Sequence, residues 1–373
     1  MSQNSFFSTP IAFEPIFKEK IWGGRSLETS LAKEIPSGSL IGESWEISGY
    51  GPDLSVAVTG EYKQLTIQQI LEKNPKGFLG DSAGYDSFPL LCKFIDANDK
   101  LSVQVHPDNE QVTENNWGLS GKTECWYIAD AQPGAQIIVG FKSGVTLEDV
   151  RTGIQNNSLG ELLNQIPVIK GDMLFIPSRT VHAILDGTLL YEVQQTSDIT
   201  FRLYDWGRVD KNGTPRQLHI AESLKTVDTT FHEQHKIPPV LVSSLNDVER
   251  FFRVACRYFA VEEYVFQRDS SLQLPKKRSF SVITVLDGAV SLYTGEKTKT
   301  AVLKGQTILL PADCYRKAVV AEGETDCRFL VSSVPDLKKE IIAPLQYKGI
   351  LNKEIALLGG NSDTNDLLPL LSG

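Results

Sequence analysis

A seven-residue segment that occurs twice in the chain constrains the fold more than any other feature. Residues 171–177 read GDMLFIP and residues 305–311 read GQTILLP, and a lysine precedes each copy. Each copy also follows a segment rich in strand-forming residues with its own glycine-bearing turn. Self-similarity of this kind is typical of a duplicated structural unit. The sequence therefore predicts two related β-barrels in tandem.

Alternation of apolar and polar residues with a period of two dominates, which predicts more strands than helices. Strands are expected over 102–106, 124–129, 136–139, 172–176, 188–195 and 200–206, and helices over 66–71, 146–154 and 158–164. We expect an all-β protein with a few short peripheral helices. The expected parts are a first unit with helical insertions (1–235), a second unit (236–335) and a C-terminal tail (336–373), to which the pattern assigns no element.

Composition and charge exclude several classes of partner. The net charge is −9 over 373 residues, whereas a nucleic-acid-binding protein normally has a basic face. No stretch approaches the ~18 apolar residues of a membrane span, and residues 1–15 lack the pattern of a secretory signal. The five cysteines are scattered and form no C-x-x-C pair, which is typical of reduced thiols. We expect a cytoplasmic monomer or weak homo-oligomer that acts on a small molecule.

Four polar residues on predicted strands are candidate metal ligands. Strand alternation sends Gln104 and His106 to one face, Glu124 lies on the next strand, and His182 follows the first copy of the repeat. Any one of these residues alone is more often structural. Their order along the chain, however, would let three strands bring them together at the mouth of one barrel. The chain has five histidines and none beyond His235, so the second unit is expected to be free of a histidine metal site.

The donor types indicate which metal this set would bind. Two imidazoles, a carboxylate and an amide oxygen suit Zn²⁺ with an open coordination position, and Fe²⁺ or Mn²⁺ could use the same ligands. The absence of a thiolate favours a catalytic centre over a closed structural one.

Three segments carry a resemblance to a known family. Residues 101–109 (LSVQVHPDN), 121–127 (GKTECWY) and 176–184 (IPSRTVHAI) resemble type I mannose-6-phosphate isomerases in their short bacterial form. Further matches are residues 21–26 (IWGGRS), 42–48 (GESWEIS), 88–96 (FPLLCKFID) and 192–206 (EVQQTSDITFRLYDW). The resemblance runs from about residue 10 to about residue 230 and weakens over the second unit. It implies two tandem cupin (jelly-roll) barrels.

The resemblance also implies an activity and a set of ligands. The family interconverts mannose 6-phosphate and fructose 6-phosphate, so the expected ligand is a sugar phosphate. The family's zinc ligands fall on His106, Glu124 and His182, and Gln104 takes the position of a fourth ligand of longer members. One departure is Arg179, where the family usually carries glycine; a positive φ there would cost on the order of 1 kcal/mol.

Further functional positions follow from the same resemblance. The family's catalytic arginine falls on Arg202, an active-site lysine on Lys122, and substrate-pocket positions on Lys93 and Ser102. The phosphate is expected at Lys93 with Ser102, and Arg179 is a further candidate at the rim.

The reaction itself limits the choice of catalytic groups. Moving a carbonyl between C1 and C2 passes through an enediolate, whose charge a metal ion and an arginine would stabilise. Lys122 is the preferred base, because it lies two residues from Glu124 on the same face. Asp198 and Glu192 are alternatives that would act through a water.

Two other functions are compatible with a metal-binding cupin. One is a sugar-sensing module without turnover, since the same fold serves regulators and enzymes. The other is a cupin dioxygenase that uses Fe²⁺ and O₂. A coupled assay for fructose 6-phosphate separates the isomerase from the sensor, and oxygen consumption separates it from the dioxygenase.

Overall fold

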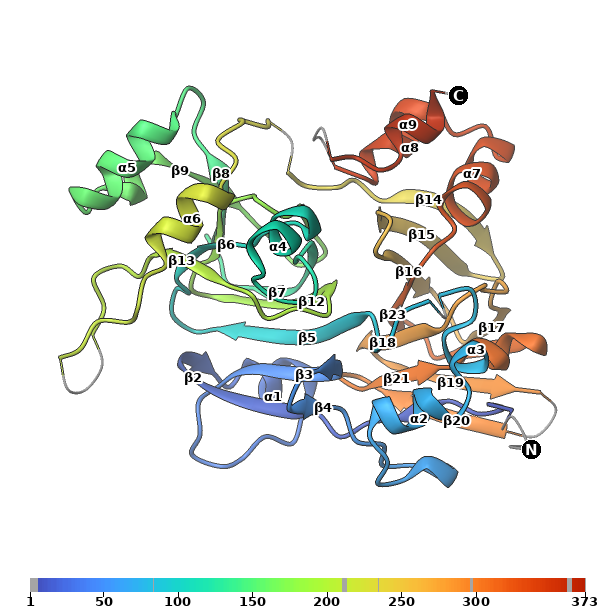
Figure 1. Ribbon diagram of the computed structural model, residues 1–373. Helices are drawn as coiled ribbons and strands as arrows, with labels where there is room; N and C mark the ends of the chain where they lie inside the picture. The colour runs from blue at the N-terminus through green and yellow to red at the C-terminus, as the bar shows by residue number, and fades with distance from the viewer. Residues whose placement is uncertain are drawn as a thin grey trace.

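Four antiparallel sheets form the framework of the computed structural model (Figure 1). The structure describes residues 6–82, 84–209, 213–233, 235–295, 298–360 and 364–372. The helices are short and lie at the periphery of the sheets. The expectation of an all-β protein with a few short peripheral helices is confirmed.

The first unit consists of two sheets that face each other. Its larger sheet has the order β10-β7-β12-β5-β3-β2, with β4 paired to β3, and its smaller sheet has the order β13-β6-β11-β8-β9. The bounds are β2 (Ile16–Gly24), β3 (Ile41–Tyr50), β4 (Asp53–Leu54), β5 (Leu90–Ala97), β6 (Val103–Val105), β7 (Glu124–Ala131), β8 (Gln136–Phe141), β9 (Leu163–Pro167), β10 (Met173–Ile176), β11 (His182–Ile184), β12 (Thr188–Gln195) and β13 (Phe201–Tyr204). Buried side chains of both sheets, such as Trp126 and Ile137, share one core.

The second unit is built in the same way. Its larger sheet has the order β1-β21-β18-β23-β16-β15-β14 and its smaller sheet β17-β22-β19-β20. The bounds are β1 (Ile11–Ala12), β14 (Val240–Leu245), β15 (Val248–Ala255), β16 (Ala260–Phe266), β17 (Ser270–Gln273), β18 (Ser281–Asp287), β19 (Ala289–Thr294), β20 (Thr298–Leu303), β21 (Thr307–Leu310), β22 (Val319–Gly323) and β23 (Arg328–Ser333). Strand β1 belongs to this sheet although it comes from the start of the chain.

The strand order confirms the internal repeat. The path β10-β7-β12-β5-β3-β2 has its counterpart in β21-β18-β23-β16-β15-β14, and the repeated segments form β10 and β21. Glu124 is the partner of Ile176 in the first sheet, and Ser281 is the partner of Leu310 in the second. The second unit therefore has a serine where the first has its candidate carboxylate ligand.

The sheets do not close on themselves in the part of the chain that the structure describes. Each is an open path of strands with two edges. Each unit is therefore a two-sheet sandwich of the jelly-roll kind, and among the described residues neither forms a closed barrel. The two large sheets also pack against each other, since Phe94 and Tyr191 share a buried cluster with Phe252 and Val261.

Two of the three expected helices are confirmed. Helix α2 (Ile67–Lys73) begins after Thr66, which forms a capping box with Gln69, and α5 (Leu147–Gln155) begins after Thr146. The prediction of a helix over 158–164 is wrong. The segment forms a single 3₁₀ turn, η2 (Leu159–Leu162), because Leu163 starts strand β9 and pairs with Phe141.

The remaining short helices decorate the sheets. They are α1 (Ser26–Leu31), η1 (Gly60–Tyr62), α3 (Pro75–Leu79), α4 (Asn109–Asn115), α6 (Ile220–Thr226), η3 (Ala312–Arg316), the π-helix η4 (Leu337–Ile342), α7 (Ala343–Tyr347), α8 (Asn352–Leu357) and α9 (Leu368–Leu371). The last four make up the C-terminal tail, and its Leu345, Ile355 and Leu358 lie in the cluster between the large sheets. No helix among the described residues is long and apolar enough to cross a bilayer.

Candidate metal centre and adjoining pocket

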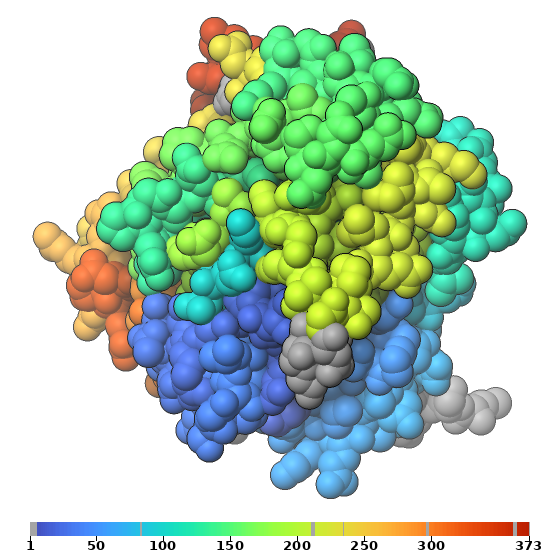
Figure 2. Space-filling model, turned by 90° about the vertical axis from the view of Figure 1, so that its left-hand side faces the viewer, coloured from blue at the N-terminus to red at the C-terminus, as the bar shows by residue number. Residues whose placement is uncertain are grey.

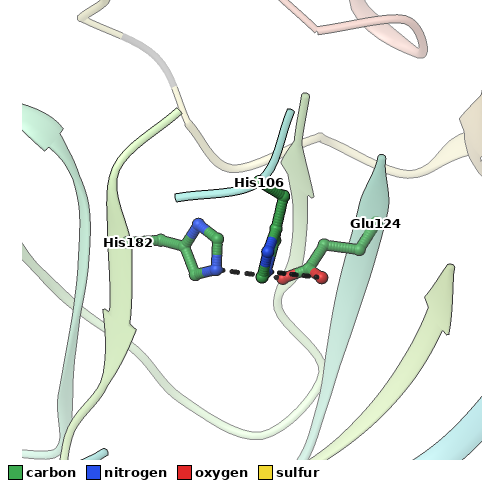
Figure 3. A group of neighbouring side chains, drawn as sticks. All are labelled: His106, Glu124 and His182. Atoms are coloured by element: carbon green, nitrogen blue, oxygen red, sulfur yellow. Dashed lines mark ion pairs between the residues drawn. The ribbon is translucent and has the colours of Figure 1, made fainter. Parts of the chain in front are cut away.

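Three buried side chains from three strand ends meet in the first unit (Figure 3). His106 follows β6, Glu124 begins β7 and His182 begins β11. One ligand atom from each lies within 4.8 Å of the other two. Nε2 of His106 is 3.6 Å, and Nε2 of His182 3.4 Å, from the Glu124 carboxylate. Figure 3 shows the three side chains pointing toward one another.

Hydrogen bonds to backbone carbonyls fix the tautomer of both imidazoles. Nδ1 of His106 lies 2.8 Å from the oxygen of Ile199, and Nδ1 of His182 lies 2.9 Å from that of Thr180. A carbonyl oxygen only accepts, so Nδ1 carries the hydrogen and Nε2 keeps its lone pair. Burial lowers the pKa of His182 to about 4 and that of His106 well below its usual value. Both rings are thus neutral at pH 7, as metal ligands must be.

Unsatisfied polar atoms at the centre fit a divalent cation. Neither Glu124 oxygen accepts a hydrogen bond, although Lys122 Nζ lies 3.0 Å from Oε2, and His182 Nε2 has no hydrogen-bond partner. A buried polar atom without a hydrogen-bond partner costs free energy of folding. A cation between two imidazoles and a carboxylate would satisfy them. In the described part of the chain this is the one group of at least three His, Cys, Asp or Glu with such geometry.

Strand register extends the centre toward a pocket. His182 on β11 is the cross-strand partner of Gln104 on β6, and Gln104 is the partner of Arg202 on β13. Residues that are partners across a sheet project from the same face. His182, Gln104 and Arg202 therefore form a row from the metal centre to the edge strand β13.

A pocket of about 410 Å³ adjoins this row. All the predicted catalytic and substrate residues line it, namely Lys93, Ser102, Lys122 and Arg202, and Gln104 does so as well. Its other ionic residues are Lys18, Lys20 and Arg216, against Glu43, Asp53, Glu192 and Asp198. The cations outnumber the carboxylates, so the pocket favours an anionic ligand.

Lys93 lies on the wall of the pocket but is already paired. Its Nζ is 3.0 Å from Glu192 and 3.8 Å from Glu43. Burial opposes the charge of Lys93, but these carboxylates outweigh it and raise its pKa. Burial would likewise raise the pKa of Glu43, yet Lys93 and Lys20 lower it to about 2. Glu192 also accepts a hydrogen bond from the Trp126 indole, which packs edge-on against the His182 ring.

Arg202 is half-buried and held at two of its nitrogens. Nε donates to the Ser102 hydroxyl at 3.0 Å, and Nη1 donates to the carbonyl of Gln217 at 2.9 Å. Lys122 Nζ lies 3.1 Å from Nε2 of His106, at the metal centre itself. The structure thus brings Ser102, Lys122 and Arg202 together around one space.

Arg179 does not belong to this pocket in the structure. It lines a different cavity, and its Nε donates to the Thr226 carbonyl. Its φ is 73°, so the position is left-handed, as the departure from glycine suggested.

Sequence reasoning missed three cations of the pocket, Lys18, Lys20 and Arg216. Lys18 and Lys20 alternate along β2, and this spacing was a usable signal. Arg216 lies between elements, where no periodicity could have pointed to it.

Fold and site together define a class: a duplicated two-sheet β protein with a candidate His–Glu–His metal centre beside a cation-rich pocket. Comparison with known proteins gives the family. Residues 11–117 match the model of the phosphomannose isomerase type I catalytic domain. Mannose-6-phosphate isomerase ManA of Bacillus subtilis is 38% identical over 310 residues, which cover 81% of this chain and 93% of that protein. The chain belongs to the type I phosphomannose isomerases.

Solved structures agree with this assignment. The crystal structure of mannose 6-phosphate isomerase from Bacillus subtilis has a TM-score of 0.79 at 33% identity, covering 87% of this chain and 100% of that one. A mannose 6-phosphate isomerase bound with zinc and yttrium is 16% identical, with a TM-score of 0.68 and coverage of 87% and 99%. The second supports the fold alone. The chain has the cupin-like fold of these isomerases.

Proposed function

We propose that this chain interconverts mannose 6-phosphate and fructose 6-phosphate through an enediolate, with one bound Zn²⁺ per chain. The observation that carries the proposal is the row His182–Gln104–Arg202, which runs from the metal centre along the wall of one cation-rich pocket. The catalytic unit would lie within residues 1–235, and residues 236–335 would form a second unit without a metal.

His106, Glu124 and His182 would hold the metal, with the amide oxygen of Gln104 as a fourth ligand. A bound Zn²⁺ would polarise the substrate carbonyl and stabilise negative charge on its oxygens. The fixed neutral imidazoles and the unsatisfied Glu124 carboxylate support this ligand set. Fe²⁺ or Mn²⁺ would accept the same donors.

Arg202 would supply the second positive charge for the enediolate. Its guanidinium lines the pocket, and the hydrogen bonds to Ser102 and Gln217 fix its direction before substrate binds. Fixed donors of this kind cost no reorganisation during the reaction. Ser102 would thus act through Arg202, and Lys93 would form the wall behind the substrate.

Lys122 would move the proton between C1 and C2. Its Nζ lies at the metal centre, 3.0 Å from Glu124 and 3.1 Å from His106, and it lines the pocket. Asp198 and Glu192 line the same pocket and remain the alternatives. Glu192 is already engaged by Lys93 and Trp126, which favours Lys122 over it.

The test is a coupled assay for fructose 6-phosphate on the wild type and on Arg202→Ala, with metal content measured on both. We expect the wild type to turn over, and Arg202→Ala to lose about 10²- to 10³-fold in kcat at unchanged metal content. Arg151→Ala, on the exposed face of α5, is the control for loss of one arginine. A metal-loaded wild type that forms no fructose 6-phosphate would reject the proposed function.

A further inference from the structure

Two arginines lie together in the pocket without enough carboxylate to balance them. Arg202 and Arg216 both line it, and Nη1 of Arg202 donates to the carbonyl of Gln217, the residue next to Arg216. His219 adds two further bonds to the backbone of Arg202, through its own N–H and its Nδ1. The segment 216–219 is therefore fastened to β13, and it places a second guanidinium beside the first.

Arg216 has a weak internal partner. In the described part of the chain its one charge partner is Asp205, at 3.6 Å, and this carboxylate is already bound closely by Arg208. The Arg216 side chain is 37% exposed. Burial, and next the charge of Arg216, lower the pKa of Arg202, so the two guanidinium groups repel each other. Two like charges held together by the fold are typical of an anion site.

The other cations of the pocket are neutralised by neighbours. Lys18 lies 2.6 Å from Asp53, Lys20 lies 3.2 Å from Glu43, and Lys93 pairs with two carboxylates. Lys122 lies at the metal centre. Arg216 differs from these cations in two ways. Its carboxylate partner is weak, and it lies at the end of the row away from the metal centre.

The order of the row matches the order of groups in the substrate. From the metal ligands the sheet runs through Gln104 to Arg202 on the edge strand β13, and Arg216 belongs to the segment fastened beyond it. A hexose 6-phosphate carries its reacting C1 and C2 at one end and its phosphate at the other. In Figure 2 the yellow-green segment around this part of the chain lies across the face between the green and the blue regions.

We propose that Arg216 binds the phosphate of the substrate and makes the enzyme specific for phosphorylated over free sugars. This inference rests on the proposed function. It replaces Lys93 with Arg216 as the phosphate partner, since the charge of Lys93 is already balanced. A planar guanidinium suits a phosphate because it donates two parallel hydrogen bonds.

The test uses the metal-loaded full chain with Arg216→Gln, Arg216→Lys and the exposed control Arg151→Gln. Arg216→Gln should raise KM for mannose 6-phosphate about 10- to 100-fold and change kcat by less than about threefold. Inorganic phosphate should inhibit the wild type competitively, and its inhibition constant should rise in parallel. Arg216→Lys should recover part of the loss, and Arg151→Gln should match the wild type. Turnover of unphosphorylated mannose should not depend on Arg216.

Two results would overturn the inference. One is an Arg216→Gln enzyme whose KM and phosphate inhibition stay within about twofold of the wild type. The other is a fall in kcat at unchanged KM, which would place Arg216 in the chemical step. Binding of inorganic phosphate can be followed without turnover by tryptophan fluorescence, to which the pocket residues Trp22 and Trp45 contribute. Failure of the proposed isomerase activity is thus read separately, from the wild type alone.

Discussion

At the scale of single residues, the centre depends on a carboxylate that is buried without a hydrogen bond. Glu124 is fully buried, and both of its oxygens face the two imidazoles and Lys122. Such a group is stable as an anion only beside positive charge. A metal ion and Lys122 would supply it.

Glu124→Gln should therefore weaken metal binding. The amide keeps the shape but loses the charge, so we expect a loss larger than the roughly 10- to 100-fold that removal of an outer-shell partner costs. Metal content after dialysis against a chelator, measured by mass spectrometry, checks this. The exposed Glu114→Gln on α4 is the control. Equal retention of metal by both variants would remove Glu124 from the ligand set.

The sequence allowed much of the site to be predicted at this scale. Alternation correctly placed Gln104 on a strand and Glu124 at the start of one, whereas His106 lies one residue beyond the end of β6. The pocket contains the predicted residues Lys93, Ser102, Lys122 and Arg202. Alternation could not give the pairing of Lys93 with Glu192 and Glu43, because those contacts depend on the register of β5 against β12 and β3.

At the scale of elements, the two large sheets have a buried, ion-paired residue at matching positions, but it is a lysine in the first sheet and a glutamate in the second. The first sheet has a cross-strand row that includes Lys93 and Trp45, and the matching row of the second includes Glu262 and Phe252. Lys93 pairs with carboxylates, whereas Glu262 pairs with Arg250 and Lys277. Lys93 thus borders the pocket in the first unit, whereas the matching Glu262 of the second unit lies in a buried ion cluster with Arg250 and Lys277.

Glu262→Gln should destabilise the protein by about 3–5 kcal/mol, because it leaves two mostly buried cations, Lys277 and Arg250, without their carboxylate. Burial opposes the charge of Glu262, but Lys277 and Arg250 lower its pKa from 4.5 to about 2. Its stabilising contribution is therefore present above pH 4.5 and is lost as the pH falls toward 2.

Denaturant unfolding between pH 7 and pH 2 measures both effects of this substitution. Wild-type stability should fall across the window from pH 4.5 to 2, and the curve of Glu262→Gln should be flatter there. Glu324→Gln, at an exposed position, should follow the wild type. Parallel curves for Glu262→Gln and the wild type would contradict the assignment.

The element boundaries show where sequence patterns fail. Helices α2 and α5 lie where the sequence predicts them, and each begins with a capping box, which is a local signal. The segment 158–164 carries leucines that suit a helix, but pairing of β9 with β8 decides its structure. Buried apolar residues of the tail after residue 336 belong to the cluster between the distant large sheets, a contact that no local pattern reveals.

At the scale of the whole molecule, the cluster between the two large sheets joins both units. Leu358 is fully buried in it, and its carbonyl accepts a hydrogen bond from the N–H of Ala255 on β15. The tail thus forms part of the main core.

Leu358→Ala should cost about 2–5 kcal/mol and should lower the melting temperature of both units together. All five tryptophans lie before residue 207, so their fluorescence reports on the first unit alone. We expect that signal to shift with the circular dichroism of the whole chain. The same substitution at Leu368, which is half-exposed in α9, is the matched control. A tryptophan transition unchanged by Leu358→Ala would show that the units unfold separately.

The pairing of β1 with β21 has a consequence for how the chain reaches this state during synthesis. Ile11 and Leu309 are direct partners, so β1 can pair with β21 only after all the residues between them have been synthesised. Before then, Ala12 can already accept its hydrogen bond from the N–H of Val58. Contacts this far apart in sequence form late, because a long loop must close first. Strand β1 therefore joins the second sheet as a late step, and its bonds to the segment around Ala57 are the native contacts that can hold it until then.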